Sequence, residues 1–107
     1  MLLQGKKAII TGGTRGIGFS VAEVFLKNGA SVALFGSRQE TVDKALAQLK
    51  SENPAWEVIG MAPDLTDYAA LDAAFSEVEN RFGRIDILVN NAGISAREPL
   101  YEYTPEA

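Results

Sequence analysis

The sequence predicts an α/β protein with a doubly wound parallel sheet, built in the order βαβαβαβ. Four short apolar segments alternate with three longer segments in which apolar residues recur at helical spacing. Strands joined by crossover helices form a parallel sheet with right-handed connections. The 107 residues fit one domain, and 47% hydrophobic and 22% charged side chains are typical of a globular chain.

The first two strands are expected at 7–11 and 31–35, because both segments are short and nearly uninterrupted apolar runs. Such runs are typical of strands that are covered on both faces. The helix between them is predicted to end at Asn28-Gly29. Its expected apolar face comprises Ile17, Val21, Val24 and Phe25.

The second helix is expected to begin at a Ser37-x-x-Glu40 capping box and to end near Glu52. Its apolar face comprises Val42, Ala45, Leu46 and Leu49. A third strand is predicted over 56–62, where Pro63 stops it.

The third helix is predicted to begin at a Thr66 cap and to end at Gly83. Its apolar stripe comprises Leu71, Phe75, Val78 and Phe82. A fourth strand is expected over 85–89, and its apolar edge is predicted to be exposed and to favour self-association. Residues 104–107, Thr-Pro-Glu-Ala, either begin a further helix or form a polar tail. The first alternative predicts a longer protein whose present chain stops before a fourth helix.

The composition excludes several function classes. The chain has no Cys and no His, which excludes disulfides, thiol nucleophiles, Cys/His zinc sites and histidine triads, and no metal site is expected. The net charge of −4 argues against nucleic-acid binding. No apolar run is long enough to span a membrane, and the first residues lack the core of a signal peptide. We therefore expect a cytoplasmic protein without nucleic-acid or membrane partners.

A glycine-rich turn lies between the first strand and the first helix. The run from Gly12 to Gly18 has the spacing G-x-x-x-G-x-G, and no Gly-Lys-Ser/Thr of a Walker loop follows it. Free N–H groups and the helix dipole favour a phosphate at this point, and glycines allow its close approach. The alternative is a tight turn with packing glycines. The candidate cofactor-binding residues in this turn are Gly12, Thr14, Arg15, Gly16, Ile17 and Gly18.

The end of the second strand bears on the choice of cofactor. Dinucleotide-binding units that prefer NAD place an acid there, whereas this chain has Gly36-Ser37-Arg38. Arg38 can pair with a 2′-phosphate and Ser37 can donate to it, so we expect NADP(H), with NAD(H) possible if Glu40 turns toward the ribose. The alternative is a solvated arginine beside a capping serine. The missing acid also argues against an S-adenosylmethionine methyltransferase.

Three motifs together resemble the short-chain dehydrogenase/reductase family. They are the cofactor motif at 11–18, Asp64-Leu65 after the third strand, and Asn-Asn-Ala-Gly at 90–93. The resemblance covers the whole chain and implies the N-terminal, dinucleotide-binding portion of one Rossmann-type domain, residues 1–107. Within the family, the chain resembles 3-oxoacyl-[acyl-carrier-protein] reductases and bacterial bile-acid 3α-hydroxysteroid dehydrogenases.

The resemblance also implies roles for single residues. Asp64 would accept from the adenine amino group, the Leu65 N–H would bind a ring nitrogen, and Asn91, Ala92 and Gly93 would lie beside the nicotinamide ribose. Asn90 is expected to tie the fourth strand to its neighbours. The alternatives are a helix-entry aspartate at position 64 and an ordinary strand-exit turn after the fourth strand.

The resemblance implies NADPH-dependent reduction of a ketone, first of all of a 3-oxoacyl thioester, by a dimeric or tetrameric enzyme. The alternatives are a hydroxysteroid or other secondary-alcohol dehydrogenase, and an inactive nucleotide-binding fragment. The family's acid is a tyrosine with a lysine four residues later, but Asp72, Pro105 and Ala107 stand four residues after the three tyrosines. No catalytic residue is therefore assigned, and the 107-residue chain alone is expected to be inactive.

Overall fold

The computed structural model describes residues 2–12, 16–64, 66–90 and 102–103. The strands are β1 (Lys7–Thr11), β2 (Ser31–Phe35), β3 (Val58–Met61), β4 (Ile87–Asn90) and β5 (Glu102–Tyr103). They form one sheet with the order β3-β2-β1-β4-β5, in which the first four are parallel and β5 is antiparallel to β4. The helices are α1 (Gly16–Lys27), α2 (Gln39–Glu52) and α3 (Tyr68–Phe82). The expected βαβαβαβ order and the doubly wound parallel sheet are confirmed, and β5 is an addition.

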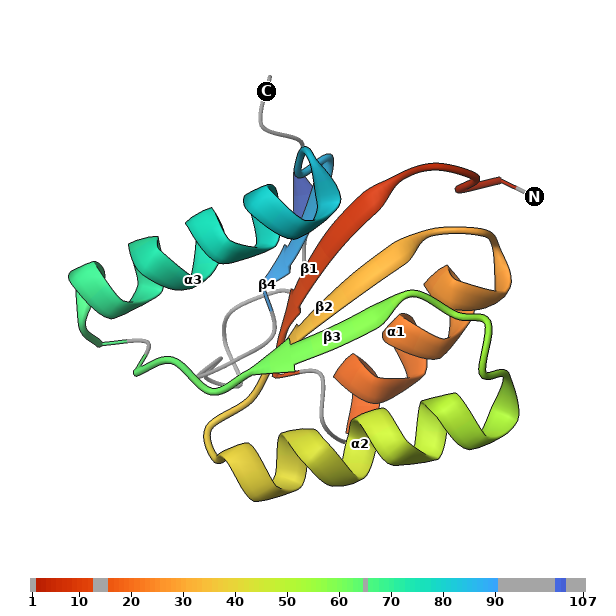
Figure 1. Cartoon of the computed structure of the whole chain (residues 1–107), viewed down its shortest axis with the longest axis horizontal. Coiled ribbons are helices and arrows are strands. Elements are labelled where there is room, and N and C mark those ends of the chain that lie inside the picture. The colour runs from red at the N-terminus through yellow and green to blue at the C-terminus, as the bar shows by residue number, and fades with distance from the viewer. Residues whose placement is uncertain (1, 13–15, 65, 91–101, 104–107) are drawn as a thin grey trace.

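The sheet separates two layers of helices, with α1 and α2 on one face and α3 on the other (Figure 1). Alternating side chains of the central strands serve the two layers, because successive residues of a strand point to opposite faces. Ile10 packs in the cluster with Ala22 and Leu26 of α1, whereas Ile9 packs with Val78 of α3. The uninterrupted apolar runs of β1 and β2 are thus explained by burial on both faces.

Strands 7–11 and 31–35 have the bounds that the sequence predicted, whereas β3 and β4 differ. β3 is shorter than 56–62, and β4 is shifted toward its carboxyl end relative to 85–89. The edge of β4 is not bare, because Leu88 pairs with Tyr103 and Val89 with Glu102. The expectation of a fully exposed fourth-strand edge was therefore wrong at these two positions.

The face that α1 buries matches the expected one only in part: Val21 and Phe25 pack against the core as predicted, but Ile17 and Val24 do not. Gly18, Ala22 and Leu26 are buried in α1, whereas Ile17 and Val24 are 65% and 53% exposed. Small residues allow the helix axis to approach the sheet closely, so Gly18 and Ala22 join Leu26 in the buried stripe. By contrast, the expected faces of α2 and α3 pack against the sheet as predicted.

Two helix caps also differ from the expected ones. Arg38 is the N-cap of α2, and no side chain caps this helix, so the Ser37 capping box does not form. Asp67 caps α3 by accepting from the N–H groups of Ala69 and Ala70 at 2.9 and 3.3 Å, in place of Thr66. The predicted ends hold: α1 ends before Asn28-Gly29, and Gly83 is the left-handed C-cap of α3.

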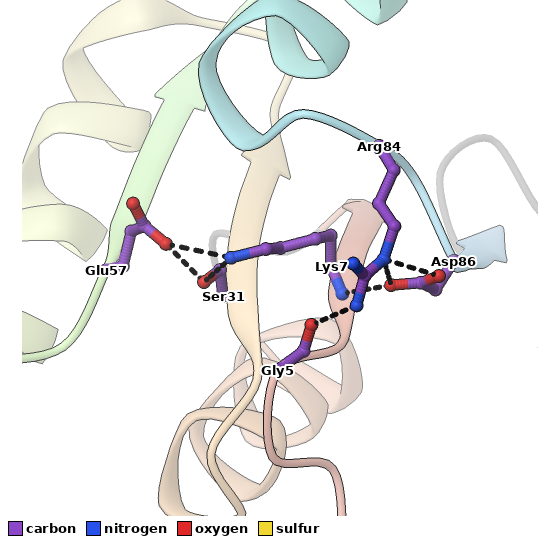
Figure 2. A network of polar contacts seen from close by, with 6 residues as sticks. All are labelled: Gly5, Lys7, Ser31, Glu57, Arg84 and Asp86. Atoms are coloured by element: carbon purple, nitrogen blue, oxygen red, sulfur yellow. Dashed lines mark hydrogen bonds and ion pairs between the residues drawn. The ribbon is translucent and has the colours of Figure 1, made fainter.

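A polar network joins the amino ends of four strands (Figure 2). The Asp86 carboxylate accepts from the Lys7 N–H at 2.8 Å and from Arg84 Nε at 2.9 Å, while Arg84 Nη2 donates to the Gly5 carbonyl at 2.6 Å. Lys7 Nζ donates to Ser31 Oγ at 3.1 Å and to Glu57, which also accepts from Ser31. The network therefore holds the strands together at the edge opposite their carboxyl ends.

In the part of the chain that the structure describes, no helix is long and apolar enough to cross a lipid bilayer.

Candidate functional site

The carboxyl ends of four parallel strands meet at one edge of the sheet. Thr11 is in register with Phe35 and Asn90, and Phe35 is in register with Met61. Each strand continues into a segment that the sequence singled out: the glycine-rich turn, Ser37-Arg38, the segment that holds Asp64, and residues 91–93. Ligands of open α/β sheets bind in the crevice outside such strand ends.

The glycine-rich turn leaves β1 through a left-handed backbone. Gly12 has φ 69° and donates its N–H to the Phe35 carbonyl at 2.7 Å, so the turn remains tied to β2. Gly16 has φ 62°, and a Cβ built there would meet nothing within 4 Å. Residues with a Cβ rarely adopt such φ values. Thr14 and Arg15 lie outside the described residues.

The start of α1 has the features of an anion site. Gly16 and Ile17 are exposed, the first turn holds no acidic residue, and the unpaired N–H groups of a helix start attract negative charge. Gly18 is buried, which fits close packing of helix and sheet. The open space at Gly16 is room that a pyrophosphate could use, so these residues fit a dinucleotide.

Ser37 and Arg38 lie exposed between β2 and α2. Since α2 has no side-chain cap, its first N–H groups and the Ser37 hydroxyl are not paired in a capping box. The Arg38 guanidinium forms an exposed ion pair with Glu40, with 3.2 Å between Nη2 and Oε1. The sequence had named Glu40 only as an acid close to the ribose position, and its contact with Arg38 appears in the structure.

Asp64 lies in the exposed segment between β3 and α3. Its Oδ1 accepts from Thr66 Oγ1 at 2.7 Å and from the Thr66 N–H at 3.0 Å. These two hydrogen bonds lower the pKa of Asp64, and the bond from the Thr66 hydroxyl has the larger effect. The carboxylate is therefore an ionised acceptor at neutral pH. The helix-entry alternative is met in part, because Asp64 shapes the turn before α3. Leu65 lies outside the described residues.

A buried hydroxyl ties the ends of β1 and β4 together. Thr11 Oγ1 donates to Asn90 Oδ1 at 3.0 Å, and Thr11 itself is only 5% exposed. The expected structural role of Asn90 is thus confirmed. Sequence reasoning had not assigned a role to Thr11, although a hydroxyl that ends an apolar strand was an available signal. Asn91, Ala92 and Gly93 lie outside the described residues.

A family model described as short chain dehydrogenase matches residues 6–107. A 3α-hydroxysteroid dehydrogenase of Mediterraneibacter gnavus is 55% identical over 106 residues, which are 99% of this chain and 42% of the relative. A sorbitol dehydrogenase of Cereibacter sphaeroides is 40% identical over 107 residues, which are 100% of this chain and 40% of the relative. The chain therefore spans about two fifths of the length of these curated relatives.

The fold of the chain is similar to that of a solved structure. The L-sorbose reductase of Gluconobacter frateurii, complexed with NADPH and L-sorbose, matches with a TM-score of 0.79 and 37% identity. The match covers 91% of this chain and 36% of that one.

Proposed function

The chain belongs to the short-chain dehydrogenase family, and from this premise we propose that it is the NADP(H)-binding part of an oxidoreductase. The substrate pair would be a ketone and a secondary alcohol. The observation that carries the proposal is the alignment of the carboxyl ends of β1, β2 and β3, which are followed along the chain by Gly12 and Gly16, by Arg38 and by Asp64. Two relatives support the proposal, because their names describe dehydrogenases of small molecules, a 3α-hydroxysteroid and sorbitol.

In this proposal the described residues hold the adenosine half of the cofactor. Gly12 and Gly16, which both have a positive φ, would lie beside the pyrophosphate, and Asp64 would accept from the adenine amino group. Residues 14, 15 and 17 of the turn, Leu65, and Asn91, Ala92 and Gly93 stay proposed contacts on the strength of the family resemblance. When bound, the cofactor would supply the hydride for reduction of the substrate.

A preference for NADP(H) over NAD(H) is supported by the start of α2. Arg38 is 68% exposed there, Ser37 stands beside it, and no side chain occupies the first turn as a cap. Arginine binds phosphate through two parallel N–H donors, and the helix dipole favours the same charge. A 2′-phosphate would therefore have three sources of attraction at this point.

For the substrate, the 55% identical relative favours the hydroxysteroid alternative over the 3-oxoacyl thioester that the sequence ranked first. Turnover of a 3α-hydroxysteroid with NADP⁺, set against turnover of a 3-oxoacyl thioester with NADPH, separates the two classes. Cofactor binding without turnover of either would support the inactive alternative, which is also the expectation for the 107-residue chain alone. Assembly into a dimer or tetramer and a cytoplasmic location are further proposals.

The cofactor proposal is tested by calorimetric titration of NADPH, NADH and S-adenosylmethionine. We expect NADPH to bind more tightly than NADH, and S-adenosylmethionine not to bind. Arg38→Ala should weaken NADPH binding by about 1–3 kcal/mol, the cost of a lost charged hydrogen bond, and NADH binding much less. Arg81→Ala is the matched control, since Arg81 pairs with Glu77 on α3. Equal losses for both cofactors would contradict the role of Arg38, and absence of nucleotide binding would contradict the proposed function.

A further inference from the structure

The ion pair between Arg38 and Glu40 occupies the place where a 2′-phosphate would be recognised. Glu40 is the second residue of α2, and its carboxylate meets the guanidinium at 3.2 Å. Both side chains are largely exposed, 68% for Arg38 and 74% for Glu40, so the pair is open to an incoming anion. An exposed pair of this kind is weak and can be exchanged for a stronger anionic partner.

Of the two acidic residues near the start of α2, Glu40 and Asp43, it is Glu40 that forms the ion pair with Arg38. Asp43, one turn further along α2, instead accepts from Gln39 Nε2 at 2.9 Å. Glu40 in the first turn is also favoured by the helix dipole, which is the competing structural explanation for its presence. That explanation predicts an effect on the stability of α2 and none on discrimination between cofactors.

We infer that Glu40 is a cofactor-selectivity residue, which competes with the 2′-phosphate of NADP(H) for the Arg38 guanidinium. The inference rests on the proposed function. A phosphate that binds Arg38 must either displace the Glu40 carboxylate or lie beside it as a second anion. Either arrangement lowers the affinity of the chain for the phosphate. NAD(H) has no 2′-phosphate and meets neither cost. Glu40 therefore reduces the ratio of the affinities for NADP(H) and NAD(H), so that NAD(H) can still bind in competition with NADP(H).

The test uses a pair of probes that differ only in the 2′-phosphate, adenosine 2′,5′-bisphosphate and adenosine 5′-monophosphate. Both are titrated calorimetrically at neutral pH and low salt into the wild-type chain and into Glu40→Gln, Glu79→Gln, Arg38→Ala and the Arg38→Ala/Glu40→Gln double variant. Glu79 is an exposed residue of α3, on the opposite face of the sheet, so Glu79→Gln makes the same change in net charge away from the site.

We expect Glu40→Gln to tighten binding of the bisphosphate about three- to tenfold and to leave the monophosphate within about twofold. Glu79→Gln should change neither. In the Arg38→Ala background the effect of Glu40→Gln on the bisphosphate should fall to about twofold or less, because the competed group is gone. Thermal unfolding of each variant reports any effect on α2 separately from the ratio of affinities.

Two results overturn the inference while leaving the proposed function in place. One is an unchanged ratio of affinities in Glu40→Gln when wild type binds both probes. The other is a weaker monophosphate with an unchanged bisphosphate, which would make Glu40 an acceptor for the ribose hydroxyl. If the wild-type chain binds neither probe nor NADPH, the proposed function fails and this inference fails with it.

Discussion

At the scale of single residues, Asp86 links the start of β1 to Arg84 in the network at the amino ends of the strands. Its carboxylate is 16% exposed and accepts from Arg84 and from the Lys7 N–H, while its own N–H donates to the Lys7 carbonyl at 2.8 Å. Burial raises the pKa of Asp86, but the hydrogen bonds from Arg84 and Lys7 outweigh it, so the pKa lies below its ordinary value of 3.8. The charged form therefore stabilises the fold.

Replacement of this carboxylate tests its contribution to stability. We expect Asp86→Asn to lower the free energy of unfolding at pH 7 by about 1–3 kcal/mol, the cost of weakening charged hydrogen bonds, as measured by urea denaturation. Asp72→Asn, an exposed change on α3, is the control and should be nearly neutral.

The same pair of variants gives the sign of the pH dependence. The pKa of Asp86 is lower in the folded chain than in the unfolded one, so its stabilisation is present in full above the unfolded value of 3.8. This stabilisation is lost as the pH falls through the folded pKa. The stability difference between wild type and Asp86→Asn should thus shrink below about pH 4, and a difference that grows on acidification would contradict this assignment.

At the scale of elements, the start of α3 depends on Asp67 rather than on Thr66. Asp67 accepts from two N–H groups of the first turn, whereas Thr66 donates its hydroxyl to Asp64 and so shapes the preceding turn. Both residues are of a type that caps helices, so local composition does not separate them. The path of the chain from β3 into α3 decides which oxygen reaches the free N–H groups.

Paired alanine substitutions test this assignment of the cap. We expect Asp67→Ala to lower the free energy of unfolding by about 0.5–2 kcal/mol, because two N–H groups of α3 lose their acceptor. Thr66→Ala should cost less, since it removes one exposed hydrogen bond outside the helix. Denaturant unfolding measures both, and a larger loss for Thr66→Ala would reverse the assignment.

At the scale of the whole molecule, the short strand β5 covers part of the edge of β4. β5 pairs with Leu88 and Val89 of β4, where an apolar strand would otherwise present free N–H and carbonyl groups. Unpaired edges of this kind favour pairing with another chain. The expected self-association of the 107-residue chain through this edge is therefore opposed by its own residues 102–103.

Removal of the covering strand tests this protection. We expect a variant that lacks residues 102–107 to associate at lower concentration than the 107-residue chain, as measured by sedimentation velocity, because β4 then becomes an open edge. A variant that lacks only residues 104–107 is the control. Equal association of all three chains would contradict a protective role for β5.

The sequence predicted most of the architecture and part of the candidate site. The runs at 7–11 and 31–35 are buried on both faces, so their composition alone gives their bounds. The exposed Gly16 at the start of α1, the exposed Arg38 and the ionised Asp64 lie where strand–turn–helix patterns indicated. The burial of α1 was less predictable, because Gly18 and Ala22 carry little hydrophobic signal yet allow close packing.

The sequence by itself determined the alternation of strands and helices, since each depends on apolar periodicity and on glycine or asparagine within a few residues. Only the tertiary structure decided which groups pair across long separations: Thr11 with Asn90, Lys7 with Asp86, and β4 with β5. It also decided that Glu40 holds Arg38 and that Ser37 caps nothing. The physical reason is that hydrogen bonds and ion pairs depend on where the folded backbone brings two groups, which local composition does not specify.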